Sequence, residues 1–197
     1  MAKLNVPYVS QISDVKDPHW QSRSCTIANT KMLFLYYEKE IGNTPTLEGL
    51  IEEGIAIKAY NQVTGWGHAG IARILRNHGL SAYNEEFRSQ AIDLTTGEVK
   101  PSSHAEALCT SGIEKVGRSV EEKHPVIISV SPDFGENKEY HTVLVIGVER
   151  DAEGKVCGFW YLDPYLLRPR GEEAIFVSLE KFKTHWRRLA IFANIPQ

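Results

Sequence analysis

The change in the pattern of apolar residues in the second half of the chain is the feature that most constrains its fold. Up to about residue 122, apolar residues recur at three and four positions, which is the period of a helix. The later part holds four β-branched or aromatic runs separated by Gly, Asp, Asn and Pro: PVIISVS, HTVLVIGVER, VCGFWYLDP and EAIFVSL. Helices first and a mostly antiparallel sheet afterwards predict an α+β domain rather than alternating βαβ units.

The first long helix is predicted to lie inside the domain. It covers CTIANTKMLFLYYEKEIG and ends at Gly42, a residue type favoured at helix C-termini. Its aliphatic and aromatic residues cover most of its circumference, and a helix of that kind is buried. Further helices are predicted over residues 46–59, over HAGIARILRNHGL, which ends at Gly79, and, more weakly, near residues 113–122.

The remaining segments predict short strands and turns. Residues 4–9 predict a strand that suits an edge because Pro7 interrupts it. The polar residues 10–24 and the turn-forming residues 93–103 predict loops. Glu153-Gly154 predicts a hairpin turn, KFKTHWRR a short helix and LAIFANI a last strand.

Composition excludes several classes of protein. The chain of 197 residues suits one domain, residues 1–197, and its formal charge of −3 with no Lys/Arg cluster argues against a nucleic-acid partner. No apolar run approaches the roughly 20 residues that cross a bilayer, so no membrane partner is expected. The start, MAKLNVPYVSQISD, has no signal-peptide pattern. We therefore expect synthesis in the cytoplasm, which leaves open delivery outside the cell by a route without a Sec signal.

Cys25 is the first candidate for chemistry. It lies in the first turn of the buried helix, where the helix dipole and free N–H groups favour the nucleophilic thiolate. Arg23 adds positive potential. The alternative is that Cys25 only packs, because free cysteines are among the most buried residues. The other two cysteines, Cys109 and Cys157, have no CxxC partner that would indicate zinc.

His141 and Asp163 are the second and third candidates. His141 opens the strongest strand, and alternation places it on the face of Val143, Val145 and Gly147. Asp163 follows the strand FWYL and precedes Pro164, so its carboxylate can project past the sheet. Each has a structural alternative, as a packed histidine and as a turn former.

Together these residues match what a cysteine hydrolase needs. The thiol requires an imidazole for an ion pair and a third group that orients the imidazole. His141 and Asp163 become neighbours if the hairpin at residues 148–155 forms. The chemistry also needs a donor to the developing oxyanion. Gln11 is predicted to supply it beside the Cys25 backbone N–H, and Gln21 is a rival.

At these motifs the chain resembles the C39-like cysteine peptidases, which have the papain-like fold. The resemblance rests on LNVPYVSQ, SCT-IANTKMLFLYY, EKHPVIISV, HTVLVIGVERD, YLDPY and EKFKTHW, and is weakest over residues 40–120. It implies a central helix packed on an antiparallel sheet. It also implies an oxyanion Gln at Gln11, the nucleophile at Cys25, and the sheet residues His141 and Asp163.

Two positions depart from the family pattern. Thr26-Ile27 stand where the family has Gly, often Gly-Pro, after the nucleophile, and Tyr140 stands where Gly is common before the histidine. The sequence therefore predicts a hydrolase of peptide or other amide bonds that requires no metal or organic cofactor. The substrate is expected to be a peptide or protein, among which peptidoglycan stem peptides are one option. The alternatives are a papain-fold binding module that has lost activity, and a transglutaminase-like acyl transferase that uses the same triad.

Other residues carry weaker signals. His68 and His78 stand ten positions apart, which does not place zinc ligands on one helical face. All four tryptophans, Trp20, Trp66, Trp160 and Trp186, are predicted to serve the core. For Trp20 and Trp66, which lie in polar segments, the alternative is a place along a substrate cleft.

Overall fold

A computed structural model describes residues 3–92, 95–136, 139–167 and 169–196. Its helices are α1 (Pro18–Gln21), α2 (Cys25–Tyr36), α3 (Glu38–Ile41), α4 (Leu47–Ala56), α5 (His68–Asn77), α6 (Ala105–Glu121) and α7 (Leu179–His185), with 3₁₀ turns η1 (Pro132–Phe134) and η2 (Arg170–Glu172). Its strands are β1 (Tyr60–Asn61), β2 (Gly65–Trp66), β3 (Ser81–Glu86), β4 (Gln90–Ile92), β5 (Val99–Pro101), β6 (Val126–Val130), β7 (His141–Arg150), β8 (Val156–Leu162), β9 (Ile175–Ser178) and β10 (Trp186–Asn194).

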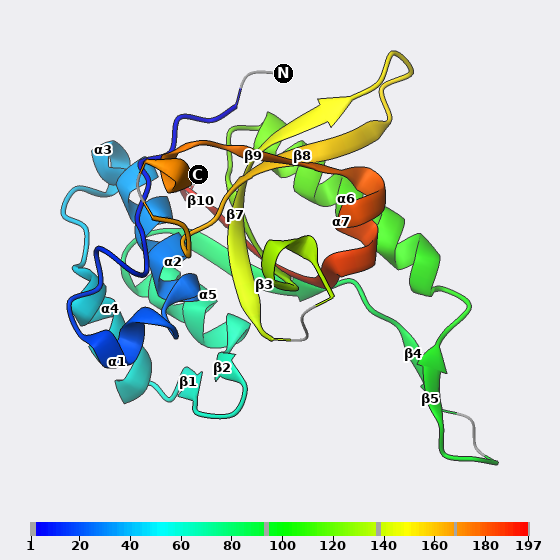
Figure 1. The fold of residues 1–197 in the computed structure, drawn as a ribbon, viewed down its shortest axis with the longest axis horizontal. Helices are drawn as coiled ribbons and strands as arrows, with labels where there is room; N and C mark the ends of the chain where they lie inside the picture. The colour runs from blue at the N-terminus through cyan, green and yellow to red at the C-terminus, as the bar shows by residue number, and fades with distance from the viewer. Residues whose placement is uncertain (1–2, 93–94, 137–138, 168, 197) are drawn as a thin grey trace.

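One six-stranded sheet organises the molecule. Its strand order is β3-β10-β6-β7-β8-β9, and every neighbouring pair is antiparallel. Helices α1 to α5 gather on one side of this sheet and α6 and α7 on the other (Figure 1). The predicted α+β class with an antiparallel sheet is confirmed.

Each face of the sheet carries its own apolar cluster. Leu144 and Ile146 of β7 pack with α2, α4 and α5, whereas Val143 and Val145 pack with α6 and α7. Strands β6 and β7 therefore have no solvent face, which explains why their sequences are continuous apolar runs. The predicted alternation stops after Val145, because the register shifts there and Val148, rather than Gly147, joins the second cluster.

Helix α2 is buried as predicted but is shorter than the predicted run. Met32, Leu33 and Phe34 have no exposed surface. The helix ends at Tyr36, and α3 adds one more turn before Gly42. Gly42 adopts φ 78°, a left-handed conformation that glycine reaches without strain.

Several predicted boundaries were wrong. Residues 4–9 form no strand; the Leu4 amide donates to the Ile146 carbonyl at 2.8 Å, and the Val6 amide donates back to the Leu4 carbonyl at 3.2 Å. The predicted loop at 93–103 contains β5, which pairs with β4, and residues 93–94 lie outside the described residues. Helix α6 begins at Ala105, well before residue 113, and the polar strand β3 was not predicted at all.

The hairpin β7–β8 brings the predicted site residues to one end of the sheet. Its turn closes where the Asp151 amide donates to the Lys155 carbonyl at 2.9 Å, and Gly154 adopts φ 80°. The predicted turn at Glu153-Gly154 is therefore confirmed. Leu144 pairs with Leu162, so His141, at the start of β7, and Asp163, directly after β8, lie at the same end of the sheet. Among the described helices, none combines the length and apolar character that crossing a membrane requires.

Candidate active site

Cys25 occupies the first position of α2 at the base of a cleft. The first hydrogen bond of the helix runs from the Ala28 amide to the Ser24 carbonyl, at 2.8 Å. The N–H groups of Cys25 and the next two residues therefore precede the intrahelical bonds, as at any helix start. These groups and the helix dipole create positive potential around the half-buried thiol.

His141 and Asp163 form a buried pair across the hairpin. The His141 Nε2 and Asp163 Oδ1 atoms are 2.8 Å apart, and the two side chains are 8% and 4% exposed. The Tyr165 amide also donates to Asp163 Oδ1, at 2.9 Å, which fixes the carboxylate. Because Nε2 is committed to Asp163, Nδ1 is the ring nitrogen that is left to interact with the thiol.

The thiol and the imidazole shift each other's ionisation. Burial by itself raises the pKa of Cys25, but the hydrogen bond and charge of His141, helped by Thr142, lower this pKa to about 7. Burial would lower the pKa of His141, yet hydrogen bonds to Asp163 and Cys25 raise it to about 10. Opposite shifts of this kind favour a thiolate–imidazolium pair over the neutral pair.

A chain of hydrogen bonds connects α2 to the start of β7 beside the thiol. The Asn29 Nδ2 donates to the Thr142 carbonyl at 2.8 Å and to the Thr142 hydroxyl at 3.1 Å. That hydroxyl donates to the Thr26 hydroxyl at 3.2 Å, whose oxygen is 3.8 Å from the Cys25 sulfur. An amide NH₂ can only donate, so the Thr142 hydroxyl passes its own proton to Thr26, and the Thr26 hydroxyl can donate to the sulfur when Cys25 is a thiolate.

The N-terminal segment supports the loop that carries Asp163. The Tyr8 hydroxyl lies 2.8 Å from the Asp163 carbonyl and 2.6 Å from the Leu166 carbonyl. The Gln11 backbone N–H donates to the Pro164 carbonyl at 2.8 Å. These contacts hold the carboxylate loop against residues that lie more than 150 positions away in the chain.

The Gln11 side chain lies behind the cleft rather than on its surface. It is 1% exposed, and its Nε2 donates to the Gln21 carbonyl at 2.7 Å. The Gln21 Nε2 in turn donates to the Val15 carbonyl at 3.1 Å. The structure thus brings Cys25, His141 and Asp163 together, while neither of the two predicted oxyanion amides lines the cleft.

The cleft is a pocket of about 470 Å³ above the thiol. It is lined by Arg23, by Tyr60 and residues 62–66 of the hairpin of β1 and β2, and by residues 139–142 before and at the start of β7. Trp66 anchors the hairpin, because its indole N–H donates to the Arg23 carbonyl at 2.7 Å. Tyr60 and Trp66 pack at 4.9 Å between ring centres. Trp66 lies on this cleft, and Trp20 lines a neighbouring pocket with Tyr60.

Three other residues of the cleft wall were not predicted to lie there, and His68 was considered only as a zinc ligand. His68, at the start of α5, lines the cleft with a buried ring Nε2 that lacks a protein partner, and burial lowers its pKa. Ser129 and Glu139 also line the cleft. Only tertiary pairing brings these residues to the thiol, so no local pattern could have identified them.

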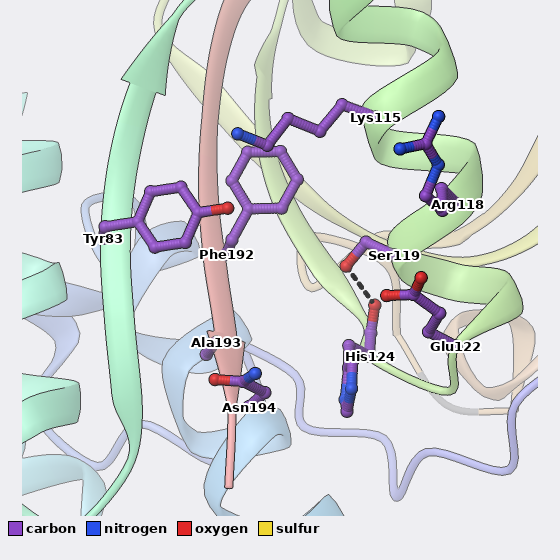
Figure 2. A pocket seen from close by; sticks show the side chains of 9 residues that line it. All are labelled: Tyr83, Lys115, Arg118, Ser119, Glu122, His124, Phe192, Ala193 and Asn194. Atoms are coloured by element: carbon purple, nitrogen blue, oxygen red, sulfur yellow. Dashed lines mark hydrogen bonds between the residues drawn. The ribbon is translucent and has the colours of Figure 1, made fainter. Parts of the chain in front are cut away.

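A second pocket, between α6 and the β3–β10 pair, offers no comparable chemistry (Figure 2). The Lys115 ammonium lies over the rings of Tyr83 and Phe192, at 5.1 and 5.2 Å from their centres. The Ser119 hydroxyl donates to the His124 carbonyl at 3.0 Å. Among the described residues, no group of three metal-ligating side chains is found anywhere in the chain.

Comparisons with known proteins agree with this arrangement. The model of the Peptidase_C39 like family matches residues 3–191. No curated protein matches the chain. A solved double glycine motif protease from an AMS/PCAT transporter, in complex with the leader peptide, is 15% identical with TM-score 0.56, over 99% of this chain and 95% of its own.

Two further solved structures are similar over the whole chain. The peptidase domain of Streptococcus ComA, a bi-functional ABC transporter involved in quorum sensing, is 17% identical with TM-score 0.55. A protein from Bacillus anthracis described as a C39-like peptidase is 15% identical with TM-score 0.60. Both comparisons cover 100% of each chain. At these identities the likeness shows the fold, and the predicted papain-like fold is confirmed.

Proposed function

Because the chain belongs to the Peptidase_C39 like family and is a cysteine peptidase, we propose that it hydrolyses peptide bonds through Cys25, His141 and Asp163. The observation that carries the proposal is the placement of His141, which interacts with the thiol on one side and lies 2.8 Å from the Asp163 carboxylate on the other. A nucleophile, a base and a group that orients the base are the parts that acyl transfer requires.

The proposed reaction has two halves. The Cys25 sulfur attacks the carbonyl carbon of the scissile bond, and the resulting tetrahedral intermediate then loses its amine, which takes a proton from His141. This leaves a thioester on Cys25. His141 next takes a proton from water, the hydroxide attacks the thioester, and the carboxylic acid leaves while the sulfur returns as thiolate. Asp163 keeps the imidazole in position throughout and stabilises its charge.

The oxyanion of the tetrahedral intermediate requires donors at the start of α2. The Cys25 backbone N–H is one of them. We propose Gln11 as the second. Its Nε2 is bonded to the Gln21 carbonyl behind the cleft, so this role requires the side chain to turn toward Cys25 when substrate binds, with the second Nε2 hydrogen as the donor. Loss of an oxyanion donor typically lowers kcat by about 10²–10³. Gln11→Ala is therefore expected to lower kcat by that factor and Gln21→Ala by much less, and equal losses would contradict this role.

A peptide is the proposed substrate, and the leader peptide bound to the similar transporter protease is consistent with it. We propose that this peptide chain lies in the cleft of about 470 Å³, between the β1–β2 hairpin and the start of β7. A protein and a peptidoglycan stem peptide are two sources of such a chain.

The experiment is cleavage of a mixed peptide library by the full chain, with new termini identified by mass spectrometry. Wild type is expected to cleave, Cys25→Ala to be inactive, and Cys157→Ala, which removes an exposed thiol elsewhere, to cleave normally. Products joined to an added amine instead of water would indicate acyl transfer. Cleavage that survives Cys25→Ala would overturn the proposal. So would a library left intact together with an unreactive Cys25, the result expected of a binding module.

A further inference from the structure

A separate pocket lies beyond Tyr140, at the end of the cleft. It has a volume of about 400 Å³, and we call it the arginine pocket because Arg88, Arg187 and Arg188 all line it. Tyr140 lines both this pocket and the cleft above Cys25, so the two are neighbours. A substrate bound across the thiol therefore reaches the arginine pocket by passing one side chain.

An irregularity in β10 creates the pocket. Trp186 pairs with Val130 and Ala190 with Ile128, so four steps along β10 match two steps along β6. Arg188, inside this bulge, adopts φ 58°. Consecutive residues of a regular strand point to opposite faces, whereas here Arg187 and Arg188 both line one pocket. Such a bulge re-aims side chains at a cost in backbone strain.

Hydrogen bonds to the backbone orient two of the arginines. The Arg187 Nη2 donates to the Glu139 carbonyl at 2.8 Å, and its guanidinium lies 4.4 Å from the centre of the Tyr140 ring. The Arg188 Nη1 donates to the Ala105 carbonyl at 3.3 Å. The Ala105 carbonyl is a neutral group, so this contact orients the Arg188 guanidinium and leaves its charge in place.

The charge around the pocket is mostly positive. Arg88 forms an ion pair with Glu86, which does not itself line the pocket. The nearby Glu106 pairs with Lys183, at 3.0 Å. Among the described lining residues, none has an acidic side chain. The walls therefore present guanidinium donors and positive potential to whatever enters.

Tyr140 takes part in this arrangement. Tyr140 is 62% exposed, and its ring forms the flat surface on which the Arg187 guanidinium rests. The resemblance to the C39-like peptidases implies Gly at this position. Without the ring, Arg187 would lose its support and the two pockets would have no wall between them.

We infer that the arginine pocket binds a carboxylate of the peptide substrate, close to the scissile bond. The inference rests on the proposed peptidase function and adds a preference to it. Guanidinium groups bind carboxylates with paired, charge-assisted hydrogen bonds, and several of them on one wall select for negative charge. Peptides supply this group as an Asp or Glu side chain or as the C-terminal carboxylate.

The first experiment measures cleavage selectivity. Library peptides that carry Asp or Asn at each position in turn are prepared with a free acid or an amide at the C-terminus. Wild type is expected to cleave the carboxylate member at least about tenfold faster at one position, and 0.5 M salt should reduce this preference. The position and the C-terminal form that show the effect identify the source of the carboxylate. Equal rates for acidic and neutral peptides would overturn the inference.

Variants of the pocket provide the matched comparison. Arg188→Gln is expected to slow cleavage of the acidic peptide about tenfold more than that of the neutral one. Arg118→Gln removes an exposed arginine in the pocket of Figure 2 and should change neither rate. If Arg188→Gln keeps the full preference for acidic peptides, the inference fails.

A second experiment separates this inference from the proposed function. Cys25→Ala protein is titrated with N-acetyl-aspartate N-methylamide and with its asparagine analogue, while NMR follows the Trp186 indole N–H in the pocket wall. Only the aspartate compound is expected to shift this signal, with weak millimolar affinity that Arg188→Gln removes. Binding without any cleavage by wild type would refute the peptidase and keep the pocket. If wild type cleaves peptides but neither assay distinguishes the acidic compound from the neutral one, the peptidase stands and the arginine pocket is refuted.

Discussion

At the scale of single residues, the interaction of Cys25 with His141 makes the reactivity of the thiol depend on pH. The thiolate forms as pH rises through the lowered pKa of about 7, and the imidazolium is lost as pH rises through about 10. Peptidase activity is therefore expected to rise near pH 7 and to fall near pH 10, with the ion pair present between these limits.

Alkylation of Cys25 by iodoacetamide, followed by peptide mapping, measures the first of these two limits. Wild type is expected to give a midpoint near pH 7. His141→Ala should move it above the ordinary thiol value of about 8.5, because burial then acts unopposed. An unchanged midpoint in His141→Ala would mean that the imidazole does not stabilise the thiolate.

The hydroxyl chain beside the thiol is expected to lower the pKa of Cys25 further. Thr142→Val keeps the shape of the side chain but removes the hydroxyl that links Asn29 to Thr26. A hydrogen bond in which one partner is charged contributes about 1.5–3 kcal/mol, so the Cys25 pKa should rise by about one unit or more. The same alkylation profile measures the shift. Thr142→Ser keeps a hydroxyl at this position and should therefore keep the Cys25 pKa close to its wild-type value.

Thr30→Val is the matched control for this prediction. Thr30 is a buried threonine of the same helix, but its hydroxyl donates to the Thr26 carbonyl, at 2.7 Å, and not to the chain that leads to the sulfur. It should alter stability without moving the Cys25 midpoint. Equal shifts in Thr30→Val and Thr142→Val would show that the effect is structural.

At the scale of elements, the close approach of α5 to the residues before β1 fixes the cleft wall. A Cβ added at Gly70 would lie 2.3 Å from the Cβ and 2.9 Å from the Cα of Ala59. Gly70→Ala must therefore push α5 away from the β1–β2 hairpin, at a cost of about 1–3 kcal/mol. Because this hairpin carries Trp66, cleavage should weaken together with thermal stability.

Gly67→Ala provides the comparison for Gly70→Ala. Its added Cβ would meet only the Ala59 carbonyl, at 3.5 Å, which is an ordinary contact. Thermal unfolding and library cleavage of Gly67→Ala should stay close to wild type. Wild-type behaviour of Gly70→Ala in both assays would show that this contact does not hold the cleft wall.

The elements also show which structure can be predicted from the sequence. Strands β6, β7 and β8 were predicted because their apolar runs are complete signals in themselves. Strand β3 was missed because SAYNEE is polar; the ladder it shares with β10 is a tertiary contact that its own residues do not encode. Residues 4–9 look like a strand, but of their amide groups only that of Leu4 bonds to the sheet.

The candidate site divides in the same way. Cys25, His141 and Asp163 stand at recognisable places, namely a helix start and two strand ends, so local patterns single them out. The partners of Thr142, more than 110 positions away in the chain, and the walls formed by Trp66 and Arg188 depend on packing between distant segments. No pattern within a short window carries that information.

At the scale of the whole molecule, the two apolar clusters share strands. Ile127 and Leu144 belong to the cluster beside α2, and Ile128 and Val143, adjacent to them in the chain, belong to the cluster beside α6. Neither cluster can lose its packing without exposing the other face of β6 and β7. We therefore expect residues 1–197 to unfold as one cooperative domain.

Two core substitutions, one in each cluster, test this expectation. Leu144→Ala removes a fully buried side chain from the first cluster and Val116→Ala one from the second. Leu144→Ala should cost about 2–5 kcal/mol and Val116→Ala less, because a smaller group is lost. Each kcal/mol of lost stability lowers the unfolding midpoint by about 2–4 °C in a chain of this length.

The decisive measurement is whether two probes report the same unfolding temperature. In each variant, near-UV circular dichroism and the accessibility of the buried Cys109 thiol should give one midpoint, lowered by the same amount. If Val116→Ala exposes Cys109 at a lower temperature while the signal from the first cluster is unchanged, the two faces unfold separately and the chain is not one domain.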